Sequence, residues 1–73
     1  MDNFFFIYSV GTITSLGEYE MVGMILDHDE LHEVINDTKN SGGTLTSVSV
    51  SMYNQKGEFI AERDITCLFT LAN

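Results

Sequence analysis

The chain has 73 residues, enough for one domain, and a domain of this size buries only ~60% of the surface that its unfolded chain exposes. Eleven Asp and Glu residues against three Lys and Arg give a formal net charge of −8. This charge disfavours direct binding to nucleic acid and to anionic membranes, because both repel a carboxylate surface, whereas a basic protein surface attracts it.

The first two apolar segments predict a β-hairpin. Residues 3–13 are rich in aromatic and β-branched side chains, as strands are. A turn at 14–18 separates them from residues 19–26, a second apolar run of strand length. Gly23 inside the second run indicates either a bulge or a close approach of another backbone.

One helix is predicted after this hairpin. Asp27 can cap its N-terminus, and Glu30 stands three residues later, as a capping box requires. Lys39 lies in the last turn, where a positive charge favours the helix dipole, and Gly42 and Gly43 end the helix. An apolar stripe at helical spacing consists of Leu31, Val34, Ile35 and Thr38.

The last two segments predict a second hairpin. Residues 44–53 alternate, so that Val48, Val50 and Met52 face one way and Ser47, Ser49 and Ser51 the other. After a turn at 54–57, residues 58–71 alternate again, with one face made of Phe59, Ala61, Ile65, Cys67, Phe69 and Leu71. Arg63 interrupts that face, and an acidic partner, a bulge or a side chain that reaches out to solvent would each account for it. Cys67 is expected to be a small buried hydrophobic residue.

Together these elements predict a single α+β domain over residues 1–73, in the order β-β-α-β-β. We expect one antiparallel sheet of about four strands with one helix packed on one face, and the strand order stays open. The single cysteine rules out an intramolecular disulfide, and the apolar run at 4–8 is too short for a signal peptide or a membrane span. These features favour a cytoplasmic location, in the host cell cytoplasm if the protein is phage-encoded.

The search for catalytic and metal-binding motifs gives one candidate. His28 and His32 stand at i and i+4 on the predicted helix, a spacing that can bind zinc or nickel. Asp29 occupies the position where a zinc protease has its catalytic Glu, and no third ligand follows. We therefore expect two solvated histidines, no metal and no cofactor. Because no nucleophile–base pair or phosphate-binding loop is present either, we do not expect an enzyme.

The acidic residues predict a partner-binding face. Five of the eleven fall within residues 27–37, at the cap of the helix or on it, and Glu30, Glu33 and Asp37 form a row on one side of it. Such a row of carboxylates can imitate the phosphates of nucleic acid and occupy a basic groove. The alternative is an ordinary solvated helix face that keeps the protein soluble. The candidate residues of this face are Asp27, Asp29, Glu30, Glu33, Asp37, Glu62 and Asp64, with Glu58 beside the last two.

The aromatic residues near the N-terminus predict self-association. A single helix covers only one face of a sheet, so bulky groups on both faces of the first strand leave an apolar surface uncovered. We expect a homodimer with two-fold symmetry. Its candidate residues are Phe4, Phe5, Phe6, Tyr8 and Met24. The alternative is that these strands are central and that a long loop covers their second face.

We therefore expect an interaction protein whose partner is a protein with a basic surface. The main hypothesis is an inhibitor or regulator that docks its acidic helix on a nucleic-acid-binding enzyme or complex. Small acidic α+β chains of this kind are common among phage-encoded inhibitors of host enzymes and defence complexes, an analogy of size and charge alone. One alternative is a homo-oligomeric structural protein that uses its apolar sheet face, and another is a weak metal-binding domain based on His28 and His32.

Overall fold

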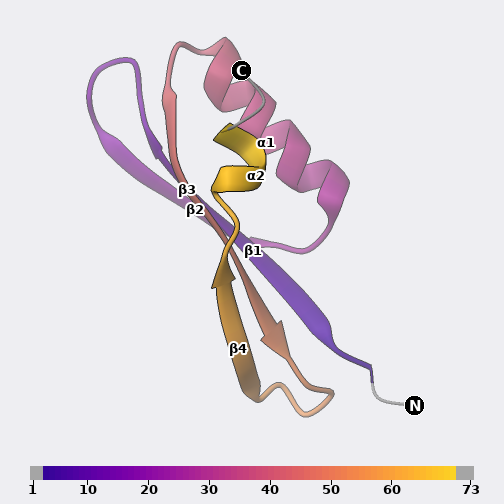
Figure 1. The fold of residues 1–73 in the computed structure, drawn as a ribbon. Coiled ribbons are helices and arrows are strands. Elements are labelled where there is room, and N and C mark those ends of the chain that lie inside the picture. The colour runs from indigo at the N-terminus through magenta and orange to yellow at the C-terminus, as the bar shows by residue number, and fades with distance from the viewer. Residues whose placement is uncertain (1–2, 71–73) are drawn as a thin grey trace.

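The computed structural model describes residues 3–70. Its elements in chain order are β1 (Phe5–Ile13), β2 (Tyr19–Ile25), α1 (His28–Asn40), β3 (Thr44–Tyr53), β4 (Phe59–Asp64) and α2 (Cys67–Thr70) (Figure 1). The four strands form one open antiparallel sheet in the order β2-β1-β3-β4. The predicted α+β class, with one sheet and one main helix, is confirmed.

Helix α1 covers only part of this sheet. It connects β2 to β3 and packs against β1 and β3 in the upper half of the view in Figure 1. The N-terminal part of β1, the C-terminal part of β3 and all of β4 extend away from it. The molecule is consequently long and narrow, with extents of 44 × 23 × 18 Å.

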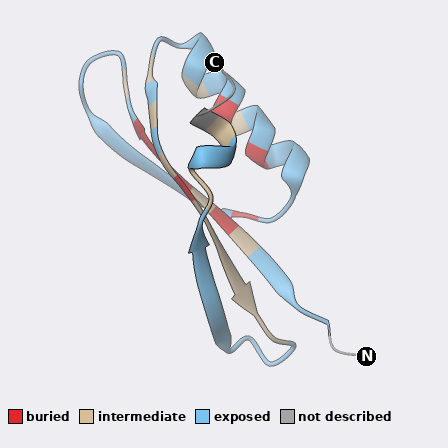
Figure 2. Ribbon diagram, in the orientation of Figure 1, coloured by how far each residue is buried: buried red, intermediate tan, exposed pale blue. Residues whose placement is uncertain are grey.

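The core lies where α1 meets the central strands (Figure 2). It contains six buried hydrophobic residues: Tyr8, Val10, Ile25, Leu31, Ile35 and Val48. Val34 and Thr38 of the predicted stripe are half-buried beside them. A core of this size stabilises a small domain only marginally.

Both predicted helix caps are confirmed. The Asp27 carboxylate accepts a hydrogen bond from the backbone N–H of Glu30, at 2.7 Å. At the other end, the N–H of Gly42 donates to Lys39 and the N–H of Gly43 to Thr38, which is the Schellman pattern. Gly42 has φ +82°, a conformation that glycine adopts without a steric penalty.

The two hairpin turns have the same hydrogen bonds. In the first, Thr14 donates its N–H to Glu18 and accepts from the N–H of Gly17. In the second, Asn54 likewise donates its N–H to Glu58 and accepts from the N–H of Gly57. Each glycine has a positive φ, as the last residue of a three-residue hairpin loop requires.

This similarity relates the two hairpins by an approximate two-fold axis. Every residue of the second turn stands forty positions after its counterpart in the first. Ser9 and Ser49 are counterparts by the same rule, and they pair with each other between β1 and β3. The axis therefore passes between these serines, perpendicular to the sheet.

The predicted bulge at Gly23 is confirmed. Tyr8 pairs with Ile25 and Val10 with Val22, so Gly23 and Met24 together oppose Ser9. The alternative, a close approach of another backbone, is wrong. A Cβ added to Gly23 would have only one neighbouring atom within 4 Å, Ser9 Oγ at 3.8 Å, and that atom belongs to a side chain. The residue with the unusual conformation is Met24, which has φ +59°.

The prediction of one continuous strand over 58–71 is wrong. Strand β4 ends at Asp64, and the helical turn α2 begins at Cys67. The Asp64 carboxylate accepts hydrogen bonds from the backbone N–H and the hydroxyl of Thr66, which turns the chain out of the sheet. Cys67 is exposed on α2, contrary to the prediction that it is buried, while Leu71 lies outside the described residues.

The expected single face of the last strand is also wrong, for a second reason. Met52 pairs with Ala61, but Tyr53 pairs with Phe59, so Ile60 is an extra residue in β4. This bulge puts Phe59 and Ala61 on opposite faces, because side chains alternate only in a regular ladder. Arg63 is exposed three residues beyond the bulge.

Candidate functional site

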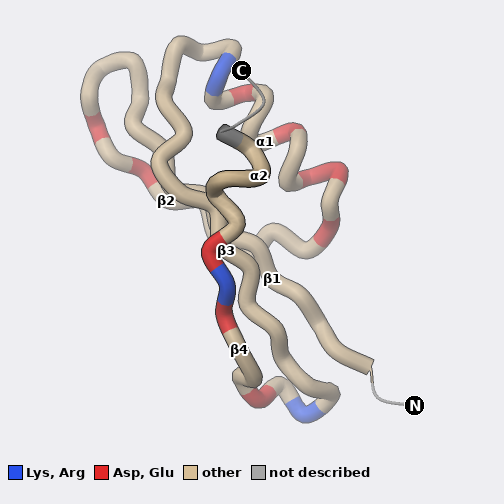
Figure 3. Tube along the Cα trace, in the orientation of Figure 1, with Lys and Arg blue, Asp and Glu red and all other residues tan. Residues whose placement is uncertain are grey.

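The first candidate surface is the acidic helix face, which we define as Asp29, Glu30, Glu33 and Asp37. All four side chains are exposed, on the side of α1 that faces away from Leu31 and Ile35. Figure 3 shows acidic positions along the outer side of this helix. The helix positions them because buried residues fix its rotation against the sheet.

The carboxylates of this face have no ion-pair partner within the part of the chain that the structure describes. The one Lys or Arg of α1 is Lys39, in its last turn. Among residues 3–70, no Lys or Arg side chain forms an ion pair with a carboxylate of the helix. Neighbours at i+3 and i+4 on a helix are about 5–6 Å apart, so these carboxylates repel one another weakly. A row of uncompensated charges of this kind attracts a cationic surface.

The remaining acidic candidates do not join that face. Asp27 lies at the start of α1 and uses its carboxylate to cap the helix. Glu62 and Asp64 pair with Ser51 and Ser49, whose side chains alternate with the core residues of β3. They therefore lie on the face of the sheet opposite α1.

Asp64 has a local structural role. Its carboxylate accepts both the backbone N–H of Thr66, at 2.8 Å, and the Thr66 hydroxyl. These hydrogen bonds, the side-chain one first, hold the pKa of Asp64 below its ordinary value of 3.8. The Thr66 hydroxyl in turn lies 2.9 Å from the backbone nitrogen of Val48. Asp64 therefore secures the junction between β4 and α2.

The two histidines lie on the flank of α1 away from the acidic helix face. Nε2 of His28 is 2.7 Å from the hydroxyl of Tyr8, and their rings meet edge to face. The ring of His32 lies 5.8 Å from that of Phe69 on α2. Both histidines are exposed, but each has an aromatic neighbour within the chain and is not simply solvated. Residues 3–70 contain no group of three or more side chains that could hold a metal ion.

The second candidate surface is apolar and occupies the half of the sheet that α1 leaves bare. Thirteen large hydrophobic residues of the described chain are exposed, more than twice the number in the core. Those in the bare half are Phe4, Phe5, Phe6, Phe59 and Ile60. Phe59 and Ile60 were missed because the bulge that exposes them leaves no sign in the sequence.

Two predicted self-association residues have other surroundings. Tyr8 is only 8% exposed and belongs to the core, because β1 passes under α1 at this point. Tyr8 is therefore not part of the exposed apolar surface, although it lines the cavity beside Phe6. Met24 is 70% exposed, but it lies at the bulge of the edge strand β2 and not beside Phe5 or Phe6 on β1.

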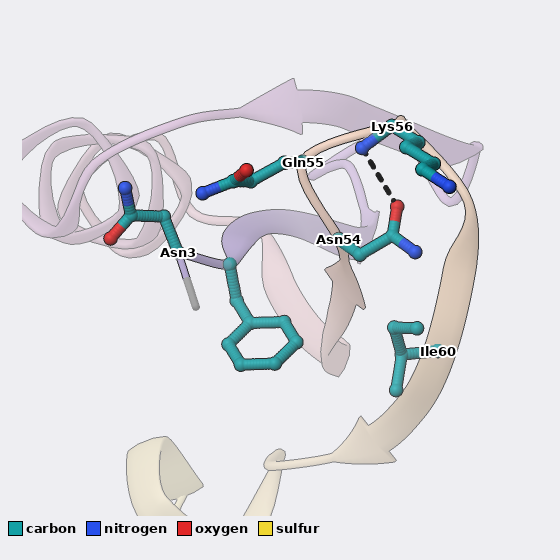
Figure 4. A pocket seen from close by; sticks show the side chains of 6 residues that line it. Asn3, Asn54, Gln55, Lys56 and Ile60 are labelled. Carbon is teal, nitrogen blue, oxygen red and sulfur yellow. Dashed lines mark hydrogen bonds between the residues drawn. The ribbon is translucent and has the colours of Figure 1, made fainter. Parts of the chain in front are cut away.

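Three cavities lie on the surface of the described chain. One of about 350 Å³ is lined by Asn3, Phe4, Asn54, Gln55, Lys56 and Ile60. Figure 4 shows it, with the hydrogen bond from the Lys56 backbone to the Asn54 side chain. A second, of about 270 Å³, is lined by Phe6, Val50, Met52, Ala61, Glu62 and Arg63. A third, of about 360 Å³, is lined by Phe4, Phe5, Phe6, Tyr8, Leu26 and His28.

No helix within residues 3–70 is long and apolar enough to cross a membrane. Comparisons of the chain with protein-family models, with curated proteins and with solved structures gave no match in any of the three. The two surfaces therefore have to be interpreted from their own chemistry.

Proposed function

We propose that the protein acts by binding another protein, and that the acidic helix face docks on a basic surface of that partner. The observation that carries this proposal is a row of exposed carboxylates on α1 that forms no ion pair with any Lys or Arg of residues 3–70. With a net charge of −8, long-range attraction would steer the chain to a basic partner and raise the association rate.

The class of partner we propose is a nucleic-acid-binding enzyme or complex, with the protein as its inhibitor or regulator. Grooves that bind nucleic acid are lined by Lys and Arg, which displace the counterions of phosphates. A rigid row of carboxylates competes for the same cations. A helix is suited to this purpose because its backbone holds the row in place, so little conformational entropy is lost on docking.

The experiment compares two triple variants that change the net charge equally. Glu30→Lys, Glu33→Lys and Asp37→Lys reverse the acidic helix face, whereas Glu18→Lys, Glu20→Lys and Glu58→Lys reverse exposed carboxylates on the hairpins. Each tagged chain is used to capture proteins from a lysate of the source cell. We expect the wild type and the hairpin variant to retain the same basic protein and the helix variant to lose it.

Two further measurements sharpen this test. Duplex DNA added to the captured complex should displace the partner, because both compete for one groove. The captured amount should also fall as salt rises, since exposed charges are screened within about 10 Å at 0.1 M salt. Retention of the same partner by the helix variant, or no effect of DNA, would contradict the proposal.

A second candidate function is a self-associating structural protein. The exposed aromatic residues in the bare half of the sheet favour it, because large apolar patches on a small protein commonly mark association sites. Self-association is compatible with docking of the acidic helix face, since the two surfaces lie on different elements.

A further inference from the structure

One stretch of sheet edge is left unpaired on a central strand. Residues 5–7 of β1 pair with residues 51–53 of β3 on one side. On the other side β2 has already ended, because its last residue, Ile25, pairs with Tyr8. We call residues 5–7, with Phe4 before them, the free β1 edge. Backbone groups along it have no partner strand and can pair with another chain.

The other edges of the sheet carry features that oppose pairing. The outer edge of β2 contains Glu20 and the bulge at Met24. That of β4 contains the bulge at Ile60 and three consecutive charged residues, 62–64. Charges and bulges of this kind prevent edge-to-edge association. The free β1 edge has neither, and its four side chains are all large and apolar.

The start of β3 is also uncharged, but it differs in two ways. Residues 44–47 are mainly Thr and Ser and contain a bulge at Thr46, opposite Gly11 and Thr12. Immediately beyond them, Val48 accepts a hydrogen bond from the N–H of Ile65, so the chain leading to α2 occupies that edge. Of the edges in the described chain, the free β1 edge is the one suited to pairing.

We propose that a second copy of this chain occupies the free β1 edge, so that two sheets join into one continuous sheet of eight strands. The two β1 strands would run antiparallel about a two-fold axis perpendicular to the sheet, with Phe6 of one copy opposite Phe6 of the other. Phe5 then lies opposite Ile7. This inference is independent of the docking of the acidic helix face.

The charge of the chain favours a second copy at this place over the other edges. Two copies each carry a charge of −8 and repel each other unless their contact excludes carboxylates. Residues 3–8 contain no charged side chain. The acidic helix face and the charges of β4 lie on other elements, so pairing at the free β1 edge does not bring them into the contact.

A cavity beside this edge provides a site for side chains of the second copy. The cavity of about 360 Å³ is formed by the three phenylalanines, Tyr8, Leu26 and His28. Aromatic side chains prefer offset or edge-to-face contacts with other rings, and this lining offers several. Because the axis relates the two copies, each would place a phenylalanine of its own strand against the cavity of the other.

The exposed apolar area at the free β1 edge indicates that the dimer would be reversible. Phe4, Phe5 and Phe6 are 43%, 57% and 48% exposed, and Leu26 is 64% exposed. With roughly 200 Å² for a whole phenylalanine, these side chains expose on the order of 400 Å² per copy. Two copies would bury on the order of 800 Å² from them alone, before backbone is counted, which is the range of weak and transient interfaces.

Sedimentation velocity of the full chain tests the proposal directly. We expect a shift from monomer to dimer between about 1 and 500 µM, the range for dimerisation free energies of about −8.2 to −4.5 kcal/mol. Dimer formation should increase with salt, because salt screens the repulsion between two acidic chains. Binding to a basic partner has the opposite salt dependence, so failure of one proposal is distinguishable from failure of the other.

Matched variants locate the interface. Phe6→Lys puts two like charges opposite each other at the axis and should reduce dimer formation at least tenfold. Phe59→Lys, at a similarly exposed phenylalanine on β4, should leave it unchanged. A chain that stays monomeric at every concentration and salt, or a dimer that Phe59→Lys abolishes and Phe6→Lys does not, would overturn the proposal.

A cross-linking variant covers the case in which Phe6→Lys does not fold. In a Cys67→Ser background, Phe6→Cys should form an intermolecular disulfide under mild oxidation. Cα atoms of directly opposed antiparallel residues lie about 4.5–5.5 Å apart, within the range that a disulfide spans. Phe59→Cys in the same background is the control and should remain reduced. Equal cross-linking of both variants would contradict the proposed pairing.

Discussion

The hydroxyl of Tyr8 lies 2.7 Å from Nε2 of His28, which ties the buried middle of β1 to the first turn of α1. Because of this contact, the Tyr8 side chain does not belong to the exposed apolar surface that the sequence predicts. His28 likewise is not a simply solvated histidine. We expect Tyr8→Phe to lower the free energy of unfolding by about 1 kcal/mol, since only the hydrogen bond is lost. Urea denaturation measures it, and Tyr53→Phe, at a half-buried tyrosine without such a bond, is the control.

A double-mutant cycle isolates the pair. If the hydroxyl is hydrogen-bonded to the imidazole in solution, the losses of unfolding free energy caused by Tyr8→Phe and by His28→Ala should not add in the double variant. The coupling free energy between the two residues should be about 0.5–1.5 kcal/mol. Additive costs would show that the contact contributes nothing to stability.

Alanine substitutions at two glycines on neighbouring strands, Gly11 and Gly23, should have different effects on the free energy of unfolding. A Cβ on Gly11 would lie 2.6 Å from Ser47 Oγ and 2.9 Å from the hydroxyl oxygen of Tyr19, so both side chains would have to move. We expect Gly11→Ala to lower the free energy of unfolding by about 1 kcal/mol. Gly23→Ala has open space and an ordinary φ, and should be neutral or stabilising by about 0.5 kcal/mol, through the unfolded state. Thermal denaturation of both variants tests whether Gly11→Ala has a lower Tm than the wild type and Gly23→Ala an equal or higher one.

Met24 should tolerate glycine better than its neighbours do. Its φ of +59° costs an L-residue roughly 1–2 kcal/mol, and its side chain is largely exposed, so little packing is lost. Met24→Gly should raise the free energy of unfolding by up to about 1 kcal/mol, whereas Met24→Val should lower it. Met21→Gly, in regular strand on the same edge, is the control and should be destabilising.

Asp64 should contribute to the pH dependence of stability. Its carboxylate is stabilised by Thr66 in the folded chain, so its pKa is below the ordinary value of 3.8. The contribution is therefore complete above that value and is lost as the pH falls through the folded pKa. The difference in unfolding free energy between wild type and Asp64→Asn should shrink in that acidic range. An NMR titration of the side-chain carboxyl should place the pKa of Asp64 below 3.8, and a higher value would contradict the Thr66 hydrogen bonds.

Local sequence was enough to predict α1 and the first hairpin. Asp27 caps the helix through the N–H of Glu30, and Gly42 ends it, because both interactions lie within a few residues of chain. Gly23 indicated either a bulge or a close approach of another backbone, and only the pairing of β2 with β1 decided for the bulge. The two hairpin turns both have a glycine, Gly17 and Gly57, at the position that requires a positive φ. This requirement also comes from the conformation of a short segment.

The sequence by itself therefore determined the four strands and the main helix, their order along the chain and the exposure of a carboxylate row on α1, since periodicity and capping are properties of short segments. Only the tertiary structure decided the strand order, the burial of Tyr8 and the end of β4 at Asp64. Each of these depends on partners far along the chain. The end of β4 depends on Val48, which accepts from the N–H of Ile65, the burial of Tyr8 depends on α1, where His28 contacts it, and the strand order depends on the pairing of β1 with β3. Register and stagger between strands set which side chains are covered, and a single extra residue such as Ile60 reverses the faces beyond it.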